Sequence, residues 1–453
     1  MKAGYGCQLF GAQQVLTGIK DCVVLLHSVV GCNYSTMALH FTACDMSEVN
    51  QTCTVISDSE VVFGGEGAVL EALHLVKEQY DPRAVFVITG CVSDMIQDDI
   101  ASVCRQFEEE TGLRTIAVDA AGYRGSFEDG YEKALAMLAD VMDAGYGCRE
   151  VGQKAGAADG GAGQTAGCAA DGARDGGAKD GIGSSGTSPE AGGKCVGVHS
   201  SVHERQCYVV NILGLGADEF RLRQDKKALQ ELLGEDIKLG AVFGDCTLEE
   251  VENASHADLN MVIGRGIKLA EIMKERFGIP YELIDYPYGL TGAQELWSAL
   301  SRHFKSDYSE REEHLRRFTG DECRRYYGYI QALYGIPVAV IGTRARARGM
   351  RRFLSEELGM EVEVMALREE NRDIQDFYDE VKNSEAALIF GSSFEQDLAD
   401  EHECPLVRFD YPVIDRFTLS YRPYIGEMGT LCLIEDILSE VVHGRKLKGA
   451  LYQ

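Results

Sequence analysis

Basic residues are scarce in this chain. Lysine and arginine together number 44 against 72 aspartates and glutamates, which leaves a formal net charge of −28. A chain without a basic surplus cannot neutralise many phosphates, and this argues against DNA, RNA or an anionic membrane surface as a partner. We therefore expect neither nucleic-acid nor membrane binding.

Long apolar runs are missing as well. The nearest approach is residues 22–30, which His27 and Ser28 interrupt and which falls short of the roughly 20 residues that cross a bilayer. The N-terminus has no basic region followed by an apolar one, so we expect no secretory signal peptide. Fifteen cysteines in such a chain predict a reducing cytoplasm, where thiols bind metals or do chemistry instead of forming disulfides.

Three common nucleotide-binding or catalytic motifs are also absent. The sequence has no Gly-x-x-x-x-Gly-Lys-Ser/Thr loop, so this chain should not hydrolyse ATP. It has neither a His-Glu-x-x-His pair nor a nucleophile elbow. Any energy from ATP would have to come from a separate protein.

What the chain does have is a repeated pattern of short apolar runs and helical segments. Residues 84–89 are β-branched and apolar on both parities, which is typical of a parallel strand buried on both faces. Helical spacing over 67–80 and 94–107 flanks this strand. Later β/α alternation includes extended segments at 207–213, 239–243, 259–263, 280–283, 338–341, 361–365 and 387–390, with helical patterns over 267–277, 294–328 and 430–442. The chain is too long for one core, so we predict an α/β fold of two to three Rossmann-like domains with parallel sheets.

The same pattern predicts the domain boundaries. An N-terminal α/β domain spans 1–145, a middle one spans 207–330 and a C-terminal one spans 331–453. Between the first two, residues 146–206 are rich in Gly, Ala, Asp and Ser and bury too little apolar area to offset their ordering entropy. We predict that this stretch is a flexible low-complexity insert.

Three cysteines near the start of the chain stand in similar settings, each directly after a glycine: Cys7, Cys32 and Cys91. None belongs to a Cys-x-x-Cys pair, which excludes a zinc ribbon or a local ferredoxin loop. Each lies at the expected end of a strand or the start of a helix, where backbone amides stabilise a thiolate and the negative charge of a cluster. One such cysteine alone would be read as a buried apolar thiol, but three together indicate a metal cluster gathered from several loops.

Three motifs then resemble the component 1 chains of nitrogenase and its relatives, with the β-type chain most similar. Residues 89–99, Thr-Gly-Cys-Val-Ser-Asp-Met-Ile-Gln-Asp-Asp, resemble the family's cysteine loop and the paired aspartates after it. Residues 57–65, Ser-Asp-Ser-Glu-Val-Val-Phe-Gly-Gly, resemble its segment for docking a reductase, and residues 405–416 resemble the β-type C-terminal signature. The resemblance covers nearly the whole chain apart from the Gly/Ala-rich insert.

By this resemblance, Cys7, Cys32 and Cys91 match three thiolates that bind an interfacial iron–sulfur cluster. A cubane needs four ligands and a P-cluster more, so the resemblance implies that an α-type component 1 chain supplies the rest, in a heterotetramer. It also implies an ATP-hydrolysing iron–sulfur reductase as electron donor, with Phe63 at its docking surface. The alternative for Phe63 is an ordinary core phenylalanine.

Two positions depart from the family pattern. Gly122 stands where some β chains have a serine near the P-cluster, which makes a simpler 4Fe–4S cluster more plausible. Gly264 stands where an α-type chain has the cysteine that holds the catalytic cofactor, so we do not expect this chain to ligate that cofactor. Cys246 is close by in sequence, but we do not favour it as a ligand.

Residues 342–352 contain five arginines directly after a predicted strand. A loop there could bind a carboxylate or phosphate through Arg344, Arg346 and Arg348. The alternative, which we favour, is an ordinary cationic helix face or a contact with an acidic partner.

The sequence therefore predicts a β-type subunit of a nitrogenase-like oxidoreductase that relays electrons through a shared cluster. Two other functions stay open. One is a scaffold subunit for assembly of a nitrogenase-type metal cofactor, and the other is a non-redox protein that binds metal or a cluster with the same fold. The substrate is not predicted.

Overall fold

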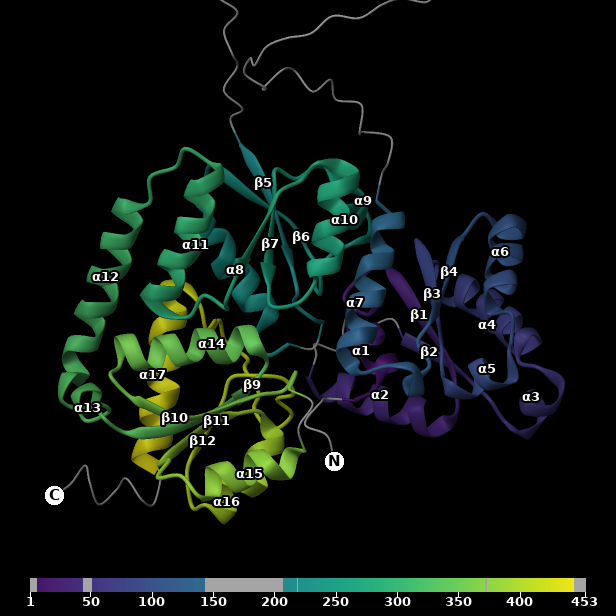
Figure 1. The fold of residues 1–453 in the computed structure, drawn as a ribbon. Helices are drawn as coiled ribbons and strands as arrows, with labels where there is room; N and C mark the ends of the chain where they lie inside the picture. The colour runs from purple at the N-terminus through teal and green to yellow at the C-terminus, as the bar shows by residue number, and fades with distance from the viewer. Residues whose placement is uncertain (1–5, 44–50, 143–206, 218, 371–372, 444–453) are drawn as a thin grey trace, which may run out of the picture. The chain divides into compact units, whose positions relative to one another are not determined.

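The computed structural model describes residues 6–43, 51–142, 207–217, 219–370 and 373–443 (Figure 1). Within these ranges the strands form three sheets of four parallel strands each, which confirms the predicted α/β class with parallel sheets. The predicted insert, residues 146–206, lies outside the described residues. The proposed division at 145, 207 and 331 stays a prediction.

The N-terminal sheet has the strand order β2-β1-β3-β4. Its strands are β1 (Cys22–Ser28), β2 (Gln51–Val55), β3 (Ala84–Thr89) and β4 (Arg114–Asp119). Helices α4 (Glu66–Tyr80) and α6 (Ile100–Thr111) cover one face, where they bury alternate residues of β1 and β3. Helices α1 (Gln8–Leu16) and α7 (Phe127–Met137) cover the other face (Figure 1). Burial on both faces explains why β1 and β3 are continuous apolar runs.

The other two sheets repeat this order of strands, β6-β5-β7-β8 and β10-β9-β11-β12. The middle sheet contains β5 (Tyr208–Leu213), β6 (Ile237–Val242), β7 (Leu259–Ile263) and β8 (Tyr281–Ile284). The C-terminal sheet contains β9 (Pro337–Gly342), β10 (Glu361–Leu367), β11 (Leu388–Gly391) and β12 (Leu406–Arg408). In each sheet the first strand in sequence lies second in the order. Because the four strands of a sheet are parallel, their carboxyl ends all meet at one edge.

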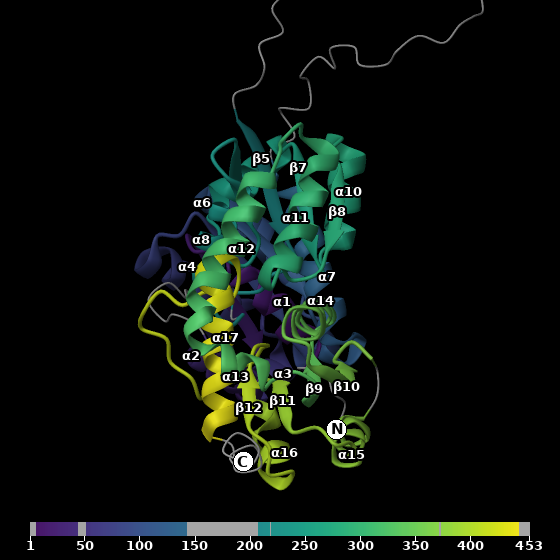
Figure 2. The same ribbon diagram turned by 90° about the vertical axis from the view of Figure 1, so that its left-hand side faces the viewer.

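The remaining α-helices connect and cover these strands. They are α2 (Val30–Ala43), α3 (Asp58–Phe63), α5 (Cys91–Ile96), α8 (Leu222–Leu233), α9 (Leu248–Asn253), α10 (Ile267–Phe277), α11 (Gly289–His303), α12 (Ser309–Cys323), α13 (Tyr327–Gln331), α14 (Arg344–Arg352), α15 (Ile374–Lys382), α16 (Gln396–Glu401) and α17 (Gly426–His443). Figure 2 shows α12 and α17 side by side.

Two helices that the sequence predicted as continuous are divided into shorter helices in the structure. The single helix expected over 94–107 is broken at Gln97, which adopts a left-handed conformation with φ 61°, and the side chain of Asp99 then caps α6. The helix expected over 294–328 is divided into α11, α12 and α13. In both cases the apolar spacing continues through a local break that only the backbone reveals.

The N-terminal segment joins the middle sheet through a close backbone contact. The N–H of Lys20 donates to the carbonyl of Cys246 at 2.9 Å, and the N–H of Cys246 donates to the carbonyl of Gly18 at 3.0 Å. A Cβ atom at Gly18 would lie 2.6 Å from the Cα of Gly244. Both positions therefore require glycine.

In the described part of the chain, no helix combines the length and apolar character needed to cross a bilayer.

Candidate functional site at the edge of the N-terminal sheet

Cys91 begins helix α5 at the carboxyl end of β3. All six residues of β3 are buried, and Gly90 leaves the strand in an extended conformation. The N–H of Gly90 donates to the carbonyl of His27 at 3.0 Å, and a side chain at position 90 would collide with Ser28. The carboxyl ends of β1 and β3 are therefore in close contact, and the partly buried Cys91 thiol lies beside this contact.

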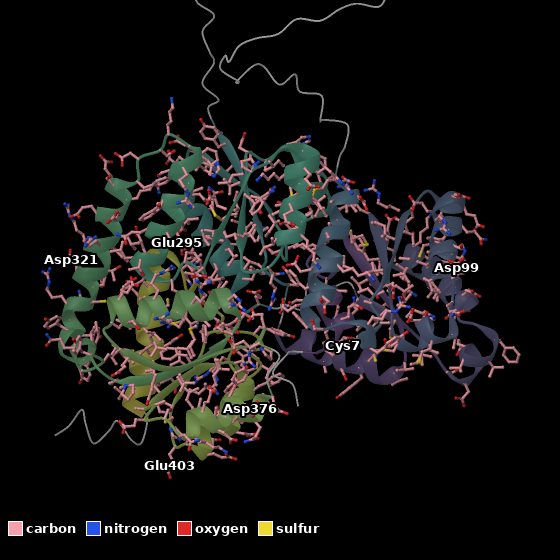
Figure 3. The ribbon with its side chains drawn as sticks, viewed as in Figure 1. Cys7, Asp99, Glu295, Asp321, Asp376 and Glu403 are labelled. Atoms are coloured by element: carbon pink, nitrogen blue, oxygen red, sulfur yellow. The ribbon has the colours of Figure 1, made fainter. Side chains whose placement is uncertain are left out.

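Cys7 comes to the same place from the start of the chain. It precedes α1 and pairs with Ser126 in an isolated antiparallel bridge (Cys7 is labelled in Figure 3). A Cβ atom at Gly122 would lie 2.7 Å from the Sγ of Cys7 and 3.4 Å from the Sγ of Cys91. The N–H of Gly122 also donates to the Sγ of Cys91 at 3.1 Å. Two of the three predicted ligands therefore converge on Gly122, and a side chain at this position would occupy the space beside both thiols.

Cys32 is the third residue of α2, the helix that follows β1. Its neighbour Asn33 fixes the start of this helix, because its amide nitrogen donates to the carbonyls of Ser28 at 3.3 Å and Thr54 at 2.9 Å. Since β1 and β3 are adjacent parallel strands, Cys32 and Cys91 lie at the same edge of the sheet. We call this place, defined by Cys7, Cys32, Cys91 and Gly122, the cysteine edge.

Three buried polar atoms near the cysteine edge have no hydrogen-bond partner. They are the Oε1 of Gln8, the Oγ of Ser28 and the Oδ1 of Asn33. Gln8 follows Cys7, Asn33 follows Cys32, and Ser28 packs against the glycine before Cys91. Buried polar atoms nearly always have a hydrogen-bond partner. Three such atoms without a partner, beside three free thiols, fit a site that binds a further group.

The described residues contain no group of three or more His, Cys, Asp or Glu side chains already arranged around one point as metal ligands. Cys7, Cys32 and Cys91 as a complete ligand set therefore stay a prediction. Their thiols and the space at Gly122 fit part of the ligand shell of an iron–sulfur cluster, which takes cysteine thiolates. Cys246 is buried in the core beside the N-terminal segment, and burial raises the pKa of its thiol to about 12.

The region around Gly264 has a different character. Gly264 follows β7 with φ 78°, and a Cβ atom there would lie 2.8 Å from the Cβ of Ala345 in α14. The next residue of α14 is Arg346, whose guanidinium is buried and bonds to Glu219 at 2.7 and 3.0 Å. The same guanidinium donates to the hydroxyl of Tyr288 at 3.2 Å and the carbonyl of Phe409 at 3.1 Å. These residues, the Gly264 junction, fill the space with protein groups that satisfy one another.

The arginine-rich segment is a helix, α14, and not the loop that an anion site would need. Arg346 points inward and is fully engaged, whereas Arg344 and Arg348 are exposed. The Nε of Arg348 lies 3.7 Å from a carboxylate oxygen of Asp285. The favoured alternative, a cationic helix face, describes Arg344 and Arg348, and an anion site at these residues stays an untested prediction.

Phe63 is not a core residue. It ends α3, a helix with no buried residue, and 84% of its surface is exposed. Val62 beside it is 70% exposed. The helix starts with a capping box in which Ser57 and Glu60 bond each other's backbone, so it is held in place without packing. An exposed apolar tip on a fixed helix is suited to contact with another protein.

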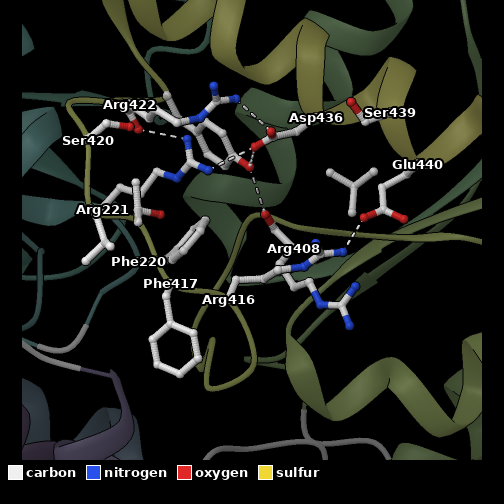
Figure 4. Close-up of a pocket in the computed structure, with 14 residues that line it drawn as sticks. Phe220, Arg221, Arg408, Arg416, Phe417, Ser420, Arg422, Asp436, Ser439 and Glu440 are labelled. Atoms are coloured by element: carbon white, nitrogen blue, oxygen red, sulfur yellow. Dashed lines mark hydrogen bonds and ion pairs between the residues drawn. The ribbon is translucent and has the colours of Figure 1, made fainter. Parts of the chain in front are cut away.

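A cavity of about 230 Å³ lies in the C-terminal half of the chain (Figure 4). Four arginines line it, and each pairs with a carboxylate: Arg221 and Arg422 with Asp436, Arg408 with Asp415, and Arg416 with Glu440. Because each arginine is already paired with a carboxylate, the cavity has little net positive charge with which to bind an anion.

Sequence reasoning missed the polar groups that support the cysteine edge, above all His27. The signal was available, because His27 and Ser28 are the polar residues in an otherwise apolar strand. Both are buried, His27 completely.

Comparison with known proteins gives one family. The family model described as nitrogenase component 1 type oxidoreductase matches residues 7–442. The chain is 27% identical over 291 residues to the nitrogenase iron-molybdenum cofactor biosynthesis protein NifE of Clostridium pasteurianum, covering 63% of this chain and 50% of that protein. It is 25% identical over 480 residues to the nitrogenase molybdenum-iron protein alpha chain of Methanothermobacter marburgensis, covering 96% of this chain and 87% of that one.

Among solved structures, nitrogenase Cp1 at pH 6.5 superposes with a TM-score of 0.70 at 17% identity, covering 98% of this chain and 93% of that chain. At this identity the likeness shows the fold. The chain spans about half the length of the first curated relatives that it matches.

Proposed function

This chain belongs to the nitrogenase component 1 type oxidoreductases, and from that premise we propose that it is a β-type subunit that holds an interfacial iron–sulfur cluster. The observation that supports this is the convergence of Cys7 and Cys91 on Gly122, with Cys32 at the same sheet edge. When bound, such a cluster would relay single electrons from an ATP-dependent reductase to a partner active site.

The residues of this chain would hold and tune the cluster. Cys7, Cys32 and Cys91 would supply thiolates, and the N–H of Gly122 already donates to one of them. Three thiolates are too few for a cubane or a larger P-cluster-like centre, so an α-type component 1 chain would complete the shell. The partly buried thiols remain accessible for that purpose. Backbone and side-chain donors near the sulfurs set a cluster's potential.

A β-type role is supported by the Gly264 junction. By the resemblance, glycine stands there in place of the cofactor-binding cysteine of an α-type chain, and Ala345 lies in the space that a side chain would need. This chain would therefore leave the catalytic cofactor to its partner. Phe63 would contact the reductase, and the complex would form a heterotetramer in a reducing cytoplasm.

A second candidate function is a scaffold subunit for assembly of a nitrogenase-type metal cofactor. It is favoured by the names of the relatives, since two proteins that resemble this chain are cofactor biosynthesis proteins. Turnover by the purified complex supports the relay, whereas transfer of a cofactor to an apo-enzyme without turnover supports the scaffold.

The first test is anaerobic co-purification with an α-type partner, followed by iron and sulfide analysis and low-temperature EPR of the reduced complex. About four irons per αβ pair indicate a cubane, and about eight indicate a P-cluster-like centre. Cys91→Ala should lose this iron. Cys323→Ala, which changes another partly buried free cysteine in α12, should keep it. An iron-free wild-type complex would overturn the cluster assignment and favour the non-redox binding protein.

Docking needs a separate test. Phe63→Ala should weaken binding of the reductase at least tenfold, because exposed aromatic residues dominate many interfaces. The control is Leu75→Ala, a partly exposed residue on α4. Equal binding by wild type and Phe63→Ala would remove Phe63 from the docking surface.

A further inference from the structure

His27 is a completely buried histidine at the carboxyl end of β1, and both of its ring nitrogens are engaged. Its Nδ1 lies 2.6 Å from the Oγ1 of Thr54, and its Nε2 lies 3.2 Å from the Oδ2 of Asp98. Burial lowers the pKa of His27, which keeps the ring neutral. In the neutral ring, Nε2–H donates to the carboxylate and Nδ1 accepts from the Thr54 hydroxyl.

Each of these two hydrogen bonds begins a chain of contacts, called an arm here, and the arm through Asp98 leads to Cys91. Asp98 directly follows α5 and its left-handed residue Gln97, and the N–H of Asp98 donates to the carbonyl of Ser93 at 3.2 Å. The bond from His27 to Asp98 therefore fixes the end of the short helix that Cys91 begins. The carbonyl of His27 also accepts from Gly90, the residue before Cys91.

The other arm leads to Cys32. Thr54 receives the amide of Asn33 at its carbonyl, 2.9 Å away, and shares its hydroxyl with His27. Asn33 is the residue after Cys32 and holds the start of α2. His27 thus connects the supports of both cysteine-bearing helices.

The same pair reaches the exposed helix α3. The Oδ1 of Asp98 accepts from the N–H of Gly65 at 2.9 Å, two residues after Phe63. A Cβ atom at Gly65 would lie 2.6 Å from the Nε2 of His27 and 2.8 Å from the Oδ2 of Asp98. The backbone after α3 packs directly on the His27–Asp98 pair.

We propose that His27 is a positioning residue that sets the placement of helices α2 and α5, and with them Cys32 and Cys91, relative to α3. The two bonds of His27 lead to two different supports, Asp98 at the end of α5 and Thr54 beside the start of α2. The link to a bound cluster rests on the proposed function, whereas the placement of the helices does not.

The two arms can be cut separately. In His27→Gln the side-chain amide takes the place of Nε2 and keeps the bond to Asp98, while in His27→Asn it takes the place of Nδ1 and keeps the bond to Thr54. Hydrogen–deuterium exchange of the full chain in its complex then reports each helix. His27→Gln should speed exchange about tenfold at residues 33–36 and spare 92–98, and His27→Asn should do the reverse.

The control is Asn211→Ala in the middle sheet, where another completely buried polar pair, Asn211 and Asn260, is broken. It should leave both segments unchanged. Uniform loosening of both segments by either His27 variant, or exchange equal to wild type, would overturn the proposal.

The cluster gives an independent readout. In the iron-containing complex, both His27 variants should keep their iron and shift the EPR signals or midpoint potential, while Asn211→Ala should not. If the wild-type complex holds no iron, the proposed function fails and the exchange test still decides on His27. If iron is present and the EPR signals and potential of both variants equal wild type, the link between His27 and the cysteines fails.

Discussion

The cysteine edge and the Gly264 junction both lie where β/α units come together, yet they are built in opposite ways. At the cysteine edge, the partly buried thiols of Cys7 and Cys91 lie against Gly122, and three buried polar atoms lack partners. At the Gly264 junction, Ala345 lies against the glycine, and each guanidinium nitrogen of Arg346 donates to a protein acceptor. The first region leaves some of its buried polar atoms unpaired, whereas the polar groups named at the second satisfy one another.

The largest expected effect follows from removing the central charge of the Gly264 junction. Arg346→Met should lower the free energy of unfolding by about 3–5 kcal/mol, because the buried Glu219 carboxylate loses its 2.7 Å ion pair and keeps only the more distant Arg265 at 4.0 Å as a cationic partner. Denaturant unfolding measures this. Arg348→Met, on the exposed face of the same helix, should stay within about 0.5 kcal/mol of wild type. Similar losses in both variants would show that the polar groups of the junction do not satisfy one another in the way described.

A smaller loss is expected at the glycine itself. Gly264→Ala should cost about 1–3 kcal/mol, since a non-glycine residue at φ 78° is strained and its Cβ would press on Ala345. Iron content of the complex should not change. A loss of iron in this variant would mean that the two regions are not independent.

The matching substitution at the cysteine edge should have a small effect on stability and a large effect on iron content. Gly122→Ser should cost only about 1 kcal/mol, because its neighbours are side chains at a partly open edge, but it should lower iron content by displacing the thiol of Cys7. Gly67→Ser is the control, because a Cβ atom there meets nothing within 4 Å. Full iron content with Gly122→Ser would break the comparison.

The smallest effect concerns a carboxylate outside both regions. Burial alone would raise the pKa of Asp245, but its bonds to Lys20 and Lys226 at 2.7 and 3.0 Å lower it below the ordinary value. Its stabilising contribution is therefore present above about pH 4 and is lost as the pH falls through the lowered pKa. Asp245→Asn should reduce stability by roughly 1 kcal/mol at pH 7, with the difference from wild type shrinking in acid. Thermal unfolding followed from pH 7 to pH 3 tests this.

The sequence was enough to predict the fold class and the strands that are buried on both faces. Residues 84–89 and 259–263 are apolar apart from Thr89 and Asn260, residues 338–341 are apolar throughout, and all three segments form central strands. Short or mixed strands were missed, such as β2 and β4 at the two edges of the N-terminal sheet, because partial burial leaves polar residues such as Thr52, Arg114 and Asp119 within them. The break at Gln97 was also missed, since a single left-handed residue has no periodicity.

The candidate site was predicted in part. Glycine before each cysteine and a position after a strand were readable, and these features are local. That Gly122 lies between Cys7 and Cys91 depends on contacts between segments 31 or more residues apart, which no spacing rule supplies. The burial of Arg346 could not be predicted either, because an arginine in a helix is expected at the surface unless its buried hydrogen-bond acceptors are known.

The close contact between Gly18 and Gly244 bears on how the chain is made. The ribosome releases the first helix and strand long before their docking surface, and at about 5–20 residues per second the interval is roughly 10–50 s. During that time the backbone groups of Gly18 and Lys20, which pair with Cys246 in the finished protein, have only water as a partner. A nascent chain arrested before residue 244 should therefore be cut by proteases near residue 18, and one arrested well after residue 260 should resist them.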